Sequence, residues 1–237
     1  MQTWQEIWSQ RGGGDKTATD LQALIELDGY DGAAAKVLAP DWQAYANAVA
    51  RLLRMGTGDS LFEVGCGAGA FLYAMREAGL RIAGGIDSSD GLVKVAGRHF
   101  PGAELRYAEA MELDVEPPCD FVLANSVFHY FPSFDYAANV LERMCRKTLK
   151  AVAVLDVPDQ ASEGESERVR RGMLGEEEYA RKYAELKHLY YPRAWFVDRA
   201  TAEGLKCEIV DQFIPNCAQS RFRFNCVIWK ASDYDQA

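Results

Sequence analysis

Three glycines at alternate positions follow directly on a short apolar run. The run is Ser60–Val64, and the glycines are Gly65, Gly67 and Gly69. A strand that leads into a glycine-rich turn and then a helix lets a ligand approach the backbone closely, and the first N–H groups of the helix face polar or anionic ligand atoms. Asp87 ends the next apolar run, where a carboxylate can accept hydrogen bonds from two ribose hydroxyls. This spacing predicts a site for a nucleotide-like cofactor.

The same glycines also fit a second class of cofactor. Gly65, Gly67 and Ala70 satisfy the permissive dinucleotide-binding pattern, so a nicotinamide-dependent oxidoreductase is an alternative. Two features count against it. Glu63 is an acid inside the expected strand, where an apolar residue is the usual choice. The chain also ends in a helix and two β-like runs instead of a second mononucleotide-binding half.

Short apolar runs alternate with helical stretches through the middle of the chain. Such alternation is typical of a parallel sheet that is covered on both faces. The expected strands are Ser60–Val64, Ile82–Ile86, Leu105–Ala108, Phe121–Ala124 and Ala151–Leu155, and the expected helices are Phe71–Ala78, Gly91–Phe100 and Phe134–Leu149. Met111–Pro118, between the third and fourth strands, is too short and too rich in proline for a full helix.

The two flanks of this region have other patterns. The expected elements are a helix over residues 41–54 with Asp41 as its N-cap, a helix over Glu176–Leu189, a helix that starts at Pro192, and β-like runs at Cys207–Phe213 and Arg221–Trp229. Ser162–Arg171 fits either a loop or a helix. The two β-like runs are close enough in sequence to form an antiparallel pair.

Composition limits the partners of this chain. It has 237 residues, 26 Lys+Arg against 35 Asp+Glu, and a formal net charge of −9. An acidic chain repels phosphate groups, so nucleic acids and anionic membranes are disfavoured as partners. No apolar run is long enough to span a membrane, the first residues do not form a signal peptide, and the six cysteines lack zinc-ligand spacing. We therefore expect a cytoplasmic, reduced protein without a metal.

The glycine motif and three later positions resemble the class I S-adenosylmethionine-dependent methyltransferases. The family's acidic-x-Gly-x-Gly-x-Gly motif is present as residues 63–69, and Asp87 matches its ribose-binding acid. Glu109 matches the acid that contacts the adenine amino group, Met111 would flank the ring, and Asn125 would lie near the methionine amine. The likeness covers about residues 55–155. It implies S-adenosyl-L-methionine as the cofactor and S-adenosyl-L-homocysteine as the product.

The resemblance assigns a set of residues to the cofactor site. They are Glu63, Gly65, Cys66, Gly67, Gly69, Asp87, Ser88, Glu109, Ala110, Met111, Asn125 and Trp8. Trp4 and Trp8, one helical turn apart, resemble the N-terminal helix that covers the cofactor in thiopurine-type methyltransferases. The chain lacks the Pro-Pro-aromatic sequence of amino-methylating DNA enzymes after its fourth strand, and it has no cluster of metal-ligand acids after its fifth. The resemblance therefore implies neither a DNA substrate nor a metal.

With this resemblance, the expected fold is a seven-stranded, mostly parallel α/β sheet with an antiparallel last strand and helices on both faces. Four regions are expected: N-terminal cap or lid helices at 1–54, a Rossmann-like cofactor-binding core at 55–156, an inserted substrate lid at 157–191, and a last helix with the C-terminal strand pair at 192–237. Such sheets bind ligands at the carboxyl ends of their strands, so both lids are expected over one mouth.

Four further residues are candidates for the acceptor side of the site. His129 follows the fourth strand, and an imidazole there can accept a proton at neutral pH, although a packed histidine is the alternative. The candidate substrate-binding residues are Tyr130, Tyr191 and Arg221. On the expected last strand Arg221 and Arg223 would share one face, where they could anchor an acidic substrate.

The sequence thus predicts methyl transfer to an oxygen or nitrogen atom of a small molecule, in secondary-metabolite or saccharide tailoring. A hydroxyl acceptor would need a base such as His129, whereas a neutral amine would need none. One alternative is an enzyme that binds S-adenosylmethionine but catalyses a non-methylating cyclisation or rearrangement. Another is a non-catalytic subunit of a methyltransferase complex, which the intact glycine motif disfavours. We expect a monomer or a homodimer.

Overall fold

The structure is a computed structural model that describes residues 4–11, 18–32, 36–183, 186 and 188–230. Its strands are β1 (Ser60–Val64), β2 (Arg81–Asp87), β3 (Glu104–Tyr107), β4 (Cys119–Asn125), β5 (Thr148–Pro158), β6 (Lys206–Asp211) and β7 (Arg223–Trp229). They form a seven-stranded sheet in the order β3-β2-β1-β4-β5-β7-β6. Strand β7 is antiparallel to both of its neighbours, and the pairs among β1 to β5 are parallel. The predicted sheet is confirmed.

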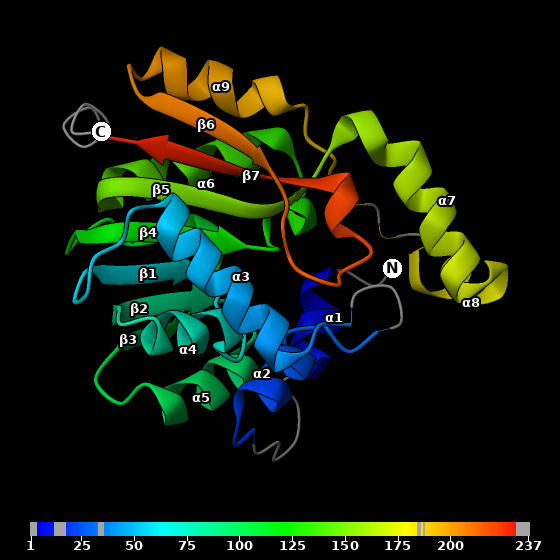
Figure 1. Cartoon of the computed structure of the whole chain (residues 1–237), viewed down its shortest axis with the longest axis horizontal. Helices are drawn as coiled ribbons and strands as arrows, with labels where there is room; N and C mark the ends of the chain where they lie inside the picture. The colour runs from blue at the N-terminus through cyan, green and yellow to red at the C-terminus, as the bar shows by residue number, and fades with distance from the viewer. Residues whose placement is uncertain (1–3, 12–17, 33–35, 184–185, 187, 231–237) are drawn as a thin grey trace.

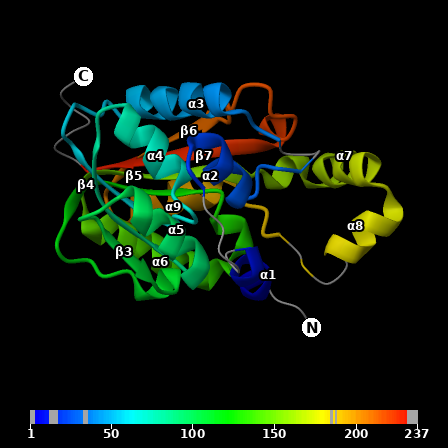
Figure 2. The ribbon, with the colours of Figure 1, turned by 90° about the horizontal axis from the view of Figure 1, so that it is seen from below.

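Helices cover both faces of the sheet (Figures 1 and 2). The first apolar core contains side chains of α2 (Leu21–Leu27), α3 (Ala39–Leu52), α4 (Ala70–Glu77) and α5 (Asp90–His99). The second core, on the opposite face, contains side chains of α6 (Phe134–Lys147) and α9 (Arg193–Ala202). The remaining α-helices of the described chain are α1 (Trp4–Arg11), α7 (Glu163–Leu174) and α8 (Glu176–Tyr183).

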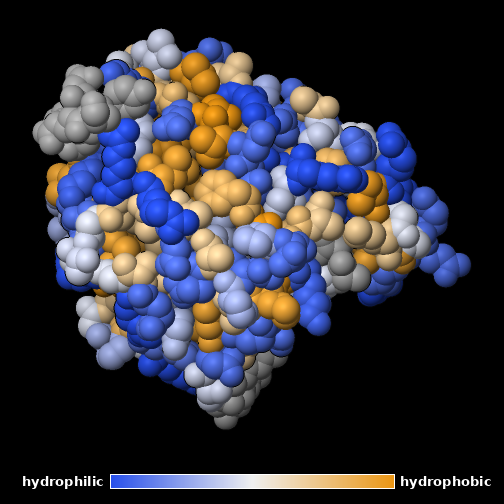
Figure 3. Space-filling view, in the orientation of Figure 1, coloured by the Kyte–Doolittle hydropathy of each residue, from blue (hydrophilic) through white to orange (hydrophobic). Residues whose placement is uncertain are grey.

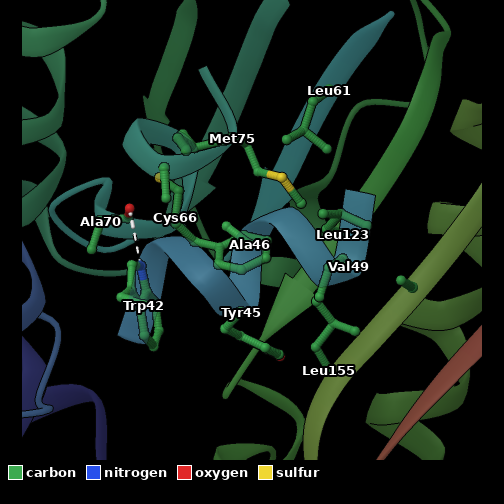
Figure 4. Close-up of a cluster of buried hydrophobic side chains, with 14 of the residues drawn as sticks. Trp42, Tyr45, Ala46, Val49, Leu61, Cys66, Ala70, Met75, Leu123 and Leu155 are labelled. Atoms are coloured by element: carbon green, nitrogen blue, oxygen red, sulfur yellow. Dashed lines mark hydrogen bonds between the residues drawn. The ribbon is translucent and has the colours of Figure 1, made fainter. Parts of the chain in front are cut away.

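Helix α3 packs against β1, β4 and α4 through one apolar face. Trp42, Tyr45 and Val49 lie at helical spacing, are fully buried, and point toward the side chains of these elements (Figure 4). The indole N–H of Trp42 donates to the carbonyl of Ala70 at 3.2 Å, which satisfies the only polar atom of this buried ring. Leu61 of β1 is fully buried in the same core. These contacts hold α3 on the first turn of α4.

Several local predictions differ from the structure. Helix α3 has Leu38 as its N-cap and Pro40 in its first turn, so Asp41 lies inside the helix and is not its N-cap. Residues 162–171, which fitted a loop or a helix, belong largely to α7. Of the helix expected over Glu176–Leu189, the structure gives α8 (Glu176–Tyr183); residues 186, 188 and 189 are not helical, and residues 184, 185 and 187 lie outside the described residues. These differences fall outside the sheet, where no strand partner fixes the ends of a helix.

The segment after β5 leaves the body of the molecule. Helices α7 and α8 project from it as an arm (Figures 1 and 3). The chain then returns to the sheet, where the N–H of Leu189 donates to the carbonyl of His129 and that of Tyr191 donates to the carbonyl of Pro158. None of the described helices is both long enough and apolar enough to span a bilayer.

A pair of leucine substitutions tests the packing of the sheet. Leu61→Ala, in the centre of the first core, should cost about 2–5 kcal/mol of unfolding free energy because it leaves a cavity among fully buried groups. Leu149→Ala, at the start of β5 and 54% exposed, should change it by no more than about 0.5 kcal/mol. Urea unfolding monitored by circular dichroism measures both. Equal costs for the two variants would contradict the assignment of β1 to the core.

Candidate functional site

A cavity of about 620 Å³ lies at the carboxyl ends of β1, β2 and β4, a volume typical of small-molecule sites. This is the edge at which parallel sheets bind their ligands. Of the residues assigned from the sequence, Glu63, Gly65, Cys66, Gly67, Asp87, Ser88, Glu109, Ala110, Asn125, Trp8 and Tyr130 line the cavity. Residues from four different loops of the sheet and from α1 therefore meet at one place.

The glycine-rich turn between β1 and α4 forms the floor of the cavity. Gly65, Gly67 and Gly69 have φ angles of +72°, +52° and +92°, in the left-handed region that favours glycine. A Cβ atom at Gly65 would collide with the side chain of Val127, and one at Gly67 with the carboxylate of Asp28. Gly69 begins α4 against Phe100 and lies outside the cavity wall. The first two glycines thus allow the close packing that shapes the floor.

The carboxylate of Asp87 holds this turn against the end of β2. Its two oxygens accept hydrogen bonds from the backbone N–H groups of Gly67 at 2.9 Å and Ser89 at 2.8 Å. Burial raises the pKa of Asp87 to about 6, although both hydrogen bonds act to lower it, and the charge of Glu109 adds to the rise. Asp87 is therefore a positioned carboxylate in the cavity wall that gives up its proton near neutral pH.

Asp28 is a functional candidate that the sequence analysis did not identify. It lies at the C-terminal end of α2, and its oxygens accept hydrogen bonds from Ala68 N–H at 2.6 Å and Ala70 N–H at 3.0 Å. It thereby caps α4, whose own N-cap residue, Gly69, has no side chain to do so. Burial raises the pKa of Asp28 to about 7. No local motif marks a cap that comes from 40 residues away.

Glu63 completes a group of acids around the turn. It is buried at the cavity wall, and its Oε2 has no hydrogen-bond partner among the described residues. Burial raises its pKa well above the ordinary value, and the charges of Asp28 and Asp87 raise it further. A buried acid without a partner is costly, so this site is suited to a ligand that supplies a hydrogen-bond donor or a positive charge.

Glu109 lies at the start of η1 (Ala110–Glu112), the single 3-10 turn that replaces a helix between β3 and β4. Its oxygens accept hydrogen bonds from the Gln5 amide at 2.6 Å and the Tyr136 hydroxyl at 3.3 Å. Burial, followed by the charge of Glu109, raises the pKa of Tyr136 to about 12, so this hydroxyl keeps its proton. Gln5 and Tyr136 are two more cavity residues that the sequence did not single out.

Asn125 ends β4 on the opposite side of the glycine turn. Its side-chain oxygen accepts a hydrogen bond from the Tyr45 hydroxyl of α3 at 3.1 Å, which leaves the amide group as a donor. The next residue, Ser126, has a φ of +60°, and both residues line the cavity. A non-glycine residue held in this conformation stores strain, a feature that is frequent at ligand sites.

Helix α1 forms the roof. Trp4, Gln5 and Trp8 line the cavity, as do Leu186 and Leu189 from the segment that returns from α8. The carbonyl of Trp8 accepts a hydrogen bond from the hydroxyl of Ser89 at 3.1 Å. The rings of Trp4 and Trp8 lie 4.8 and 5.4 Å from that of Tyr130, between ring centres. Described residues of both expected lid regions thus border the same cavity.

His129 lies behind the wall and not in it. The 3-10 turn η2 (Phe128–Tyr130) turns Tyr130 toward the cavity and His129 into the protein, where only 1% of the histidine is exposed. Burial lowers the pKa of His129 well below its ordinary value, and the charges of Arg223, His188 and Arg170 lower it further. The histidine at the expected position after β4 is therefore a neutral, packed ring.

Three other assigned residues also lie outside the described cavity wall. Tyr191 is fully buried in the second core, and its hydroxyl donates to the Phe128 carbonyl at 2.9 Å. Arg221 lies in the 3-10 turn η4 (Ser220–Phe222) before β7, with its side chain 61% exposed, so it does not share a strand face with Arg223. Met111 packs against the second core.

No group of three or more His, Cys, Asp or Glu side chains in the described ranges is arranged to hold a metal ion. The cavity instead combines a glycine-rich turn, a set of carboxylates and an aromatic roof. This arrangement can bind a ligand that carries hydroxyl or amino donors and a positive charge, and it can exclude water from that ligand.

Comparison with known proteins identifies the central segment. Residues 62–155 match the family model of a methyltransferase domain. Trans-aconitate 2-methyltransferase of Methylobacterium nodulans is 32% identical over 101 residues, which are 42% of this chain and 38% of that protein. Cyclosporin synthetase simA of Tolypocladium inflatum is 34% identical over 96 residues, which are 36% of this chain and 1% of that protein. The match thus spans much less than two thirds of either relative.

Solved structures extend the likeness to nearly the whole chain. The plantazolicin methyltransferase BpumL, solved with a triazolic desmethylPZN analog and SAH, has a TM-score of 0.64 at 14% identity, over 95% of this chain and 98% of its own. Magnesium protoporphyrin IX methyltransferase from Synechocystis PCC 6803, solved with bound SAH, has a TM-score of 0.58 at 12% identity, over 94% and 92%. The chain therefore has the fold of these solved methyltransferases, and its residues 62–155 match a methyltransferase domain.

Proposed function

We propose that this protein transfers a methyl group from S-adenosylmethionine to an oxygen or nitrogen atom of a small molecule, such as a secondary metabolite or a saccharide. The domain match supports the reaction. The names of the relatives, which include trans-aconitate and plantazolicin methyltransferases, support a small acceptor. The net charge of −9 favours a partner other than nucleic acid. The proposal includes a cytoplasmic monomer or homodimer with the four regions expected from the sequence.

The acids of the cavity wall are the observation that carries this proposal. Asp28, Glu63, Asp87 and Glu109 all line one cavity, and its described lining contains no lysine, arginine or histidine. Burial raises the pKa of the first three, and the charge of Arg11, which lies outside the cavity wall, lowers that of Asp28 only in part. S-adenosylmethionine carries a sulfonium and an ammonium group, so its charge suits this wall. A nicotinamide dinucleotide, with its pyrophosphate, would be repelled.

The geometry supports a division of roles among these residues. In the proposal Asp87 accepts hydrogen bonds from the ribose, and Glu109, beside Ala110, accepts one from the adenine amino group. Glu63, Asn125 and the turn at Gly65 and Gly67 surround the methionine end. Trp8 covers the cofactor from α1. Met111 and Gly69 support the wall from behind, since neither lines the cavity.

S-adenosylmethionine, when bound, supplies a methyl carbon that its sulfonium already activates. The protein then has to align the acceptor with this carbon and exclude water from both. Helix α1, Leu186 and Leu189 provide the cover. Because His129 lies behind the wall, the reaction proposed here relies on an acceptor that arrives as a nucleophile, such as a neutral amine or an ionised oxygen.

The first test is cofactor binding with a charge-matched pair of variants. Asp87→Asn should weaken S-adenosylmethionine binding about 10- to 100-fold, because a charge-assisted hydrogen bond contributes about 1.5–3 kcal/mol. Asp90→Asn removes an exposed acid that lies three residues after Asp87 and is paired with Lys94, and it should leave the affinity unchanged. Titration calorimetry decides between them. Wild-type affinity in Asp87→Asn would contradict the ribose assignment, and comparable binding of NAD would contradict the cofactor class.

The affinity for S-adenosylmethionine should rise between about pH 5 and pH 8. Asp87, with a pKa of about 6, and Asp28, with a pKa of about 7, are partly protonated below these values, and only their carboxylate forms attract a cation. Neutral S-adenosylhomocysteine should show a smaller rise. Calorimetry at several pH values measures both, and Asp28→Asn should flatten the upper part of the curve. Equal pH dependence of the two ligands would contradict the charge argument.

The same pKa values predict the opposite trend for stability without ligand. Both carboxyls have folded-state pKa values above their ordinary value, so the folded state binds more protons than the unfolded chain between about pH 4 and pH 7. Their contribution to stability is therefore complete below about pH 4 and is lost as the pH rises through 6 and 7. Urea unfolding of wild type and Asp28→Asn across this range measures the loss, which should be smaller in the variant.

His129→Gln tests whether the histidine is a base. We expect the rate of methyl transfer to stay within about tenfold of wild type, because a general base contributes about 100-fold or more and this ring does not line the cavity. Mass spectrometry of the methylated acceptor, with trans-aconitate as the first compound tried, gives the rate. If the rate of methyl transfer falls about 100-fold in a variant that keeps its fold and its cofactor affinity, His129 is a general base after all.

A further inference from the structure

One part of the cavity wall is apolar and is left unused by the proposed contacts to the cofactor. Its members line the cavity and are half-buried: Trp4 of α1, Tyr130 of η2, and Leu186 and Leu189 of the segment that returns from α8. The ring centres of Trp4 and Tyr130 lie 4.8 Å apart. The N–H of Leu189 donates to the carbonyl of His129, the residue before Tyr130, at 3.0 Å. Three segments of the chain thus form one surface, which we call the apolar wall.

Two histidine rings, His129 and His188, pack against the aromatic members of the apolar wall. Burial lowers the pKa of both histidines well below the ordinary value, and the charges of Arg170 and Arg223 lower each of them further, so both rings are neutral. Neither arginine lines the described cavity, and Arg223 is paired with the carboxylate of Asp156 at 2.8 Å. A ligand at the apolar wall therefore contacts no described side chain that carries a positive charge.

The acids around the glycine turn oppose an anionic ligand in the same cavity. The described lining contains four of them, and it contains no lysine, arginine or histidine that could pair with a carboxylate or phosphate of the ligand. Burial raises the pKa of Asp28, Glu63 and Asp87, so a further negative charge in this space would cost free energy. The cofactor and the acceptor together should therefore bring a positive charge into the cavity and keep it there.

The charge balance of methyl transfer depends on the acceptor atom. The lone pair of an amine nitrogen forms a bond to the methyl carbon, the bond from this carbon to sulfur breaks, and its electron pair stays on sulfur. The positive charge therefore passes from sulfur to nitrogen and remains beside the acids until the methylated nitrogen gives its proton to solvent. An ionised oxygen would instead cancel the charge and leave the buried acids without that cation. An amine thus suits this cavity better than an ionised oxygen does.

The apolar wall favours an aromatic body for the amine. Aromatic rings pack on one another in offset or edge-to-face arrangements, and Trp4 and Tyr130 provide such rings. An aromatic amine is neutral at physiological pH, because its lone pair is delocalised into the ring, so it reaches the cavity without a proton that a base would have to remove. An alkyl amine is protonated at that pH, as lysine is, and His129 does not line the cavity.

We propose that the acceptor of the methyl transfer is an aromatic amine, which enters the cavity uncharged, packs its ring on the apolar wall and directs its nitrogen to the methyl carbon. This inference rests on the proposed function and adds the chemical class of the acceptor. Trp4, Leu186 and Leu189 lie outside residues 62–155, which match the methyltransferase domain. The domain match therefore describes the cofactor side of the cavity and only one member of the apolar wall.

The first test uses three benzene derivatives of one shape: para-toluidine, para-cresol and para-toluate, of which only the last is an anion at neutral pH. Trans-aconitate and methyl glucoside serve as a second anion and as a polar neutral compound. Each is titrated into wild-type protein in a calorimeter, with and without S-adenosylhomocysteine. We expect saturable binding of para-toluidine and at least about tenfold weaker binding of both anions and of the glucoside. The inference is overturned if para-toluidine does not bind in either series, or if an anion or the glucoside binds as tightly.

A matched pair of lysine variants places the acceptor at the apolar wall. Leu186→Lys adds to this wall the cation that the described lining lacks, whereas Leu149→Lys adds the same charge at an exposed position at the start of β5. Leu186→Lys should bind para-toluate at least about tenfold more tightly than Leu149→Lys does, because it supplies a charge-assisted contact. Equal affinities of the two variants would show that the acceptor does not bind at this wall.

Trp4 tests the aromatic contact itself. Trp4→Leu should weaken para-toluidine about 2- to 10-fold, as expected for the loss of one ring contact, and Trp4→Phe, which keeps a ring, should weaken it less. Circular dichroism confirms the fold of each variant, and the lysine pair decides the question if Trp4→Leu does not fold. A folded Trp4→Leu variant with the affinity of the wild type would contradict packing on the apolar wall.

Methyl transfer from S-adenosylmethionine separates nitrogen from oxygen. The hydroxyl of para-cresol has to lose a proton before it can attack, and the described lining offers no histidine as a base. Mass spectrometry should therefore show that para-toluidine is methylated at least about tenfold faster than para-cresol. A faster reaction of para-cresol would overturn the assignment of an amine.

The same titrations separate this inference from the proposed function. The affinity for S-adenosylhomocysteine is measured first for each protein. If the wild type binds neither S-adenosylhomocysteine nor S-adenosylmethionine, the proposed function fails, and the series without cofactor still decides whether the apolar wall binds an aromatic amine. If it binds the cofactor but not para-toluidine, the methyltransferase proposal stands and only the acceptor class is wrong.

Discussion

The carboxyl groups of Asp28, Glu63 and Asp87 surround a single glycine-rich turn, and burial opposes the ionisation of all three. This side of the cavity thus brings three acids together at a place where their negative charges are costly. Asp28 and Asp87 hold the turn by accepting three hydrogen bonds from backbone N–H groups of residues 67–70, so these acids cannot move apart without loosening the start of α4. The same carboxylates that hold the turn therefore carry the negative charge that a cationic ligand would neutralise.

On the β5 and β7 side of the cavity, buried polar groups form hydrogen bonds with one another. The carboxylate of Asp156 accepts hydrogen bonds from Tyr30, Gln212 and Arg223, and its backbone N–H donates to the side chain of Asn225. Asp156 has a φ of +58°, so this network also holds a strained backbone at the end of β5. A buried network with its partners in place is rigid, whereas Oε2 of Glu63 has no hydrogen-bond partner within the described part of the chain. The cavity therefore has a buried acid suited to a ligand's donor beside the glycine turn, and a fully hydrogen-bonded network around Asp156 on the β5 side.

The sequence predicted the parts of the fold and site that depend on neighbours along the chain. The sheet, the glycine turn and Asp87 follow from local patterns, because each strand, turn and helix N-terminus has its own signature. Asp28 and Tyr136 reach the cavity only through contacts between distant segments, for which one sequence gives no signal. The prediction that Arg221 and Arg223 share a strand face was wrong for a related reason. Arg221 lies in a 3-10 turn before β7, and side chains alternate between faces only inside a strand.

The helix cap that Asp28 supplies also bears on where this protein could be cut. The segment that matches the methyltransferase family, residues 62–155, contains the glycine turn but neither the cap of α4, nor α3, nor β7. As an isolated fragment it would leave β5 with an unpaired row of backbone N–H and C=O groups and the first core uncovered, conditions under which strands join other copies of themselves. Sequence similarity marks the segment that contains the glycine turn, whereas autonomous folding needs chain on both sides of that segment.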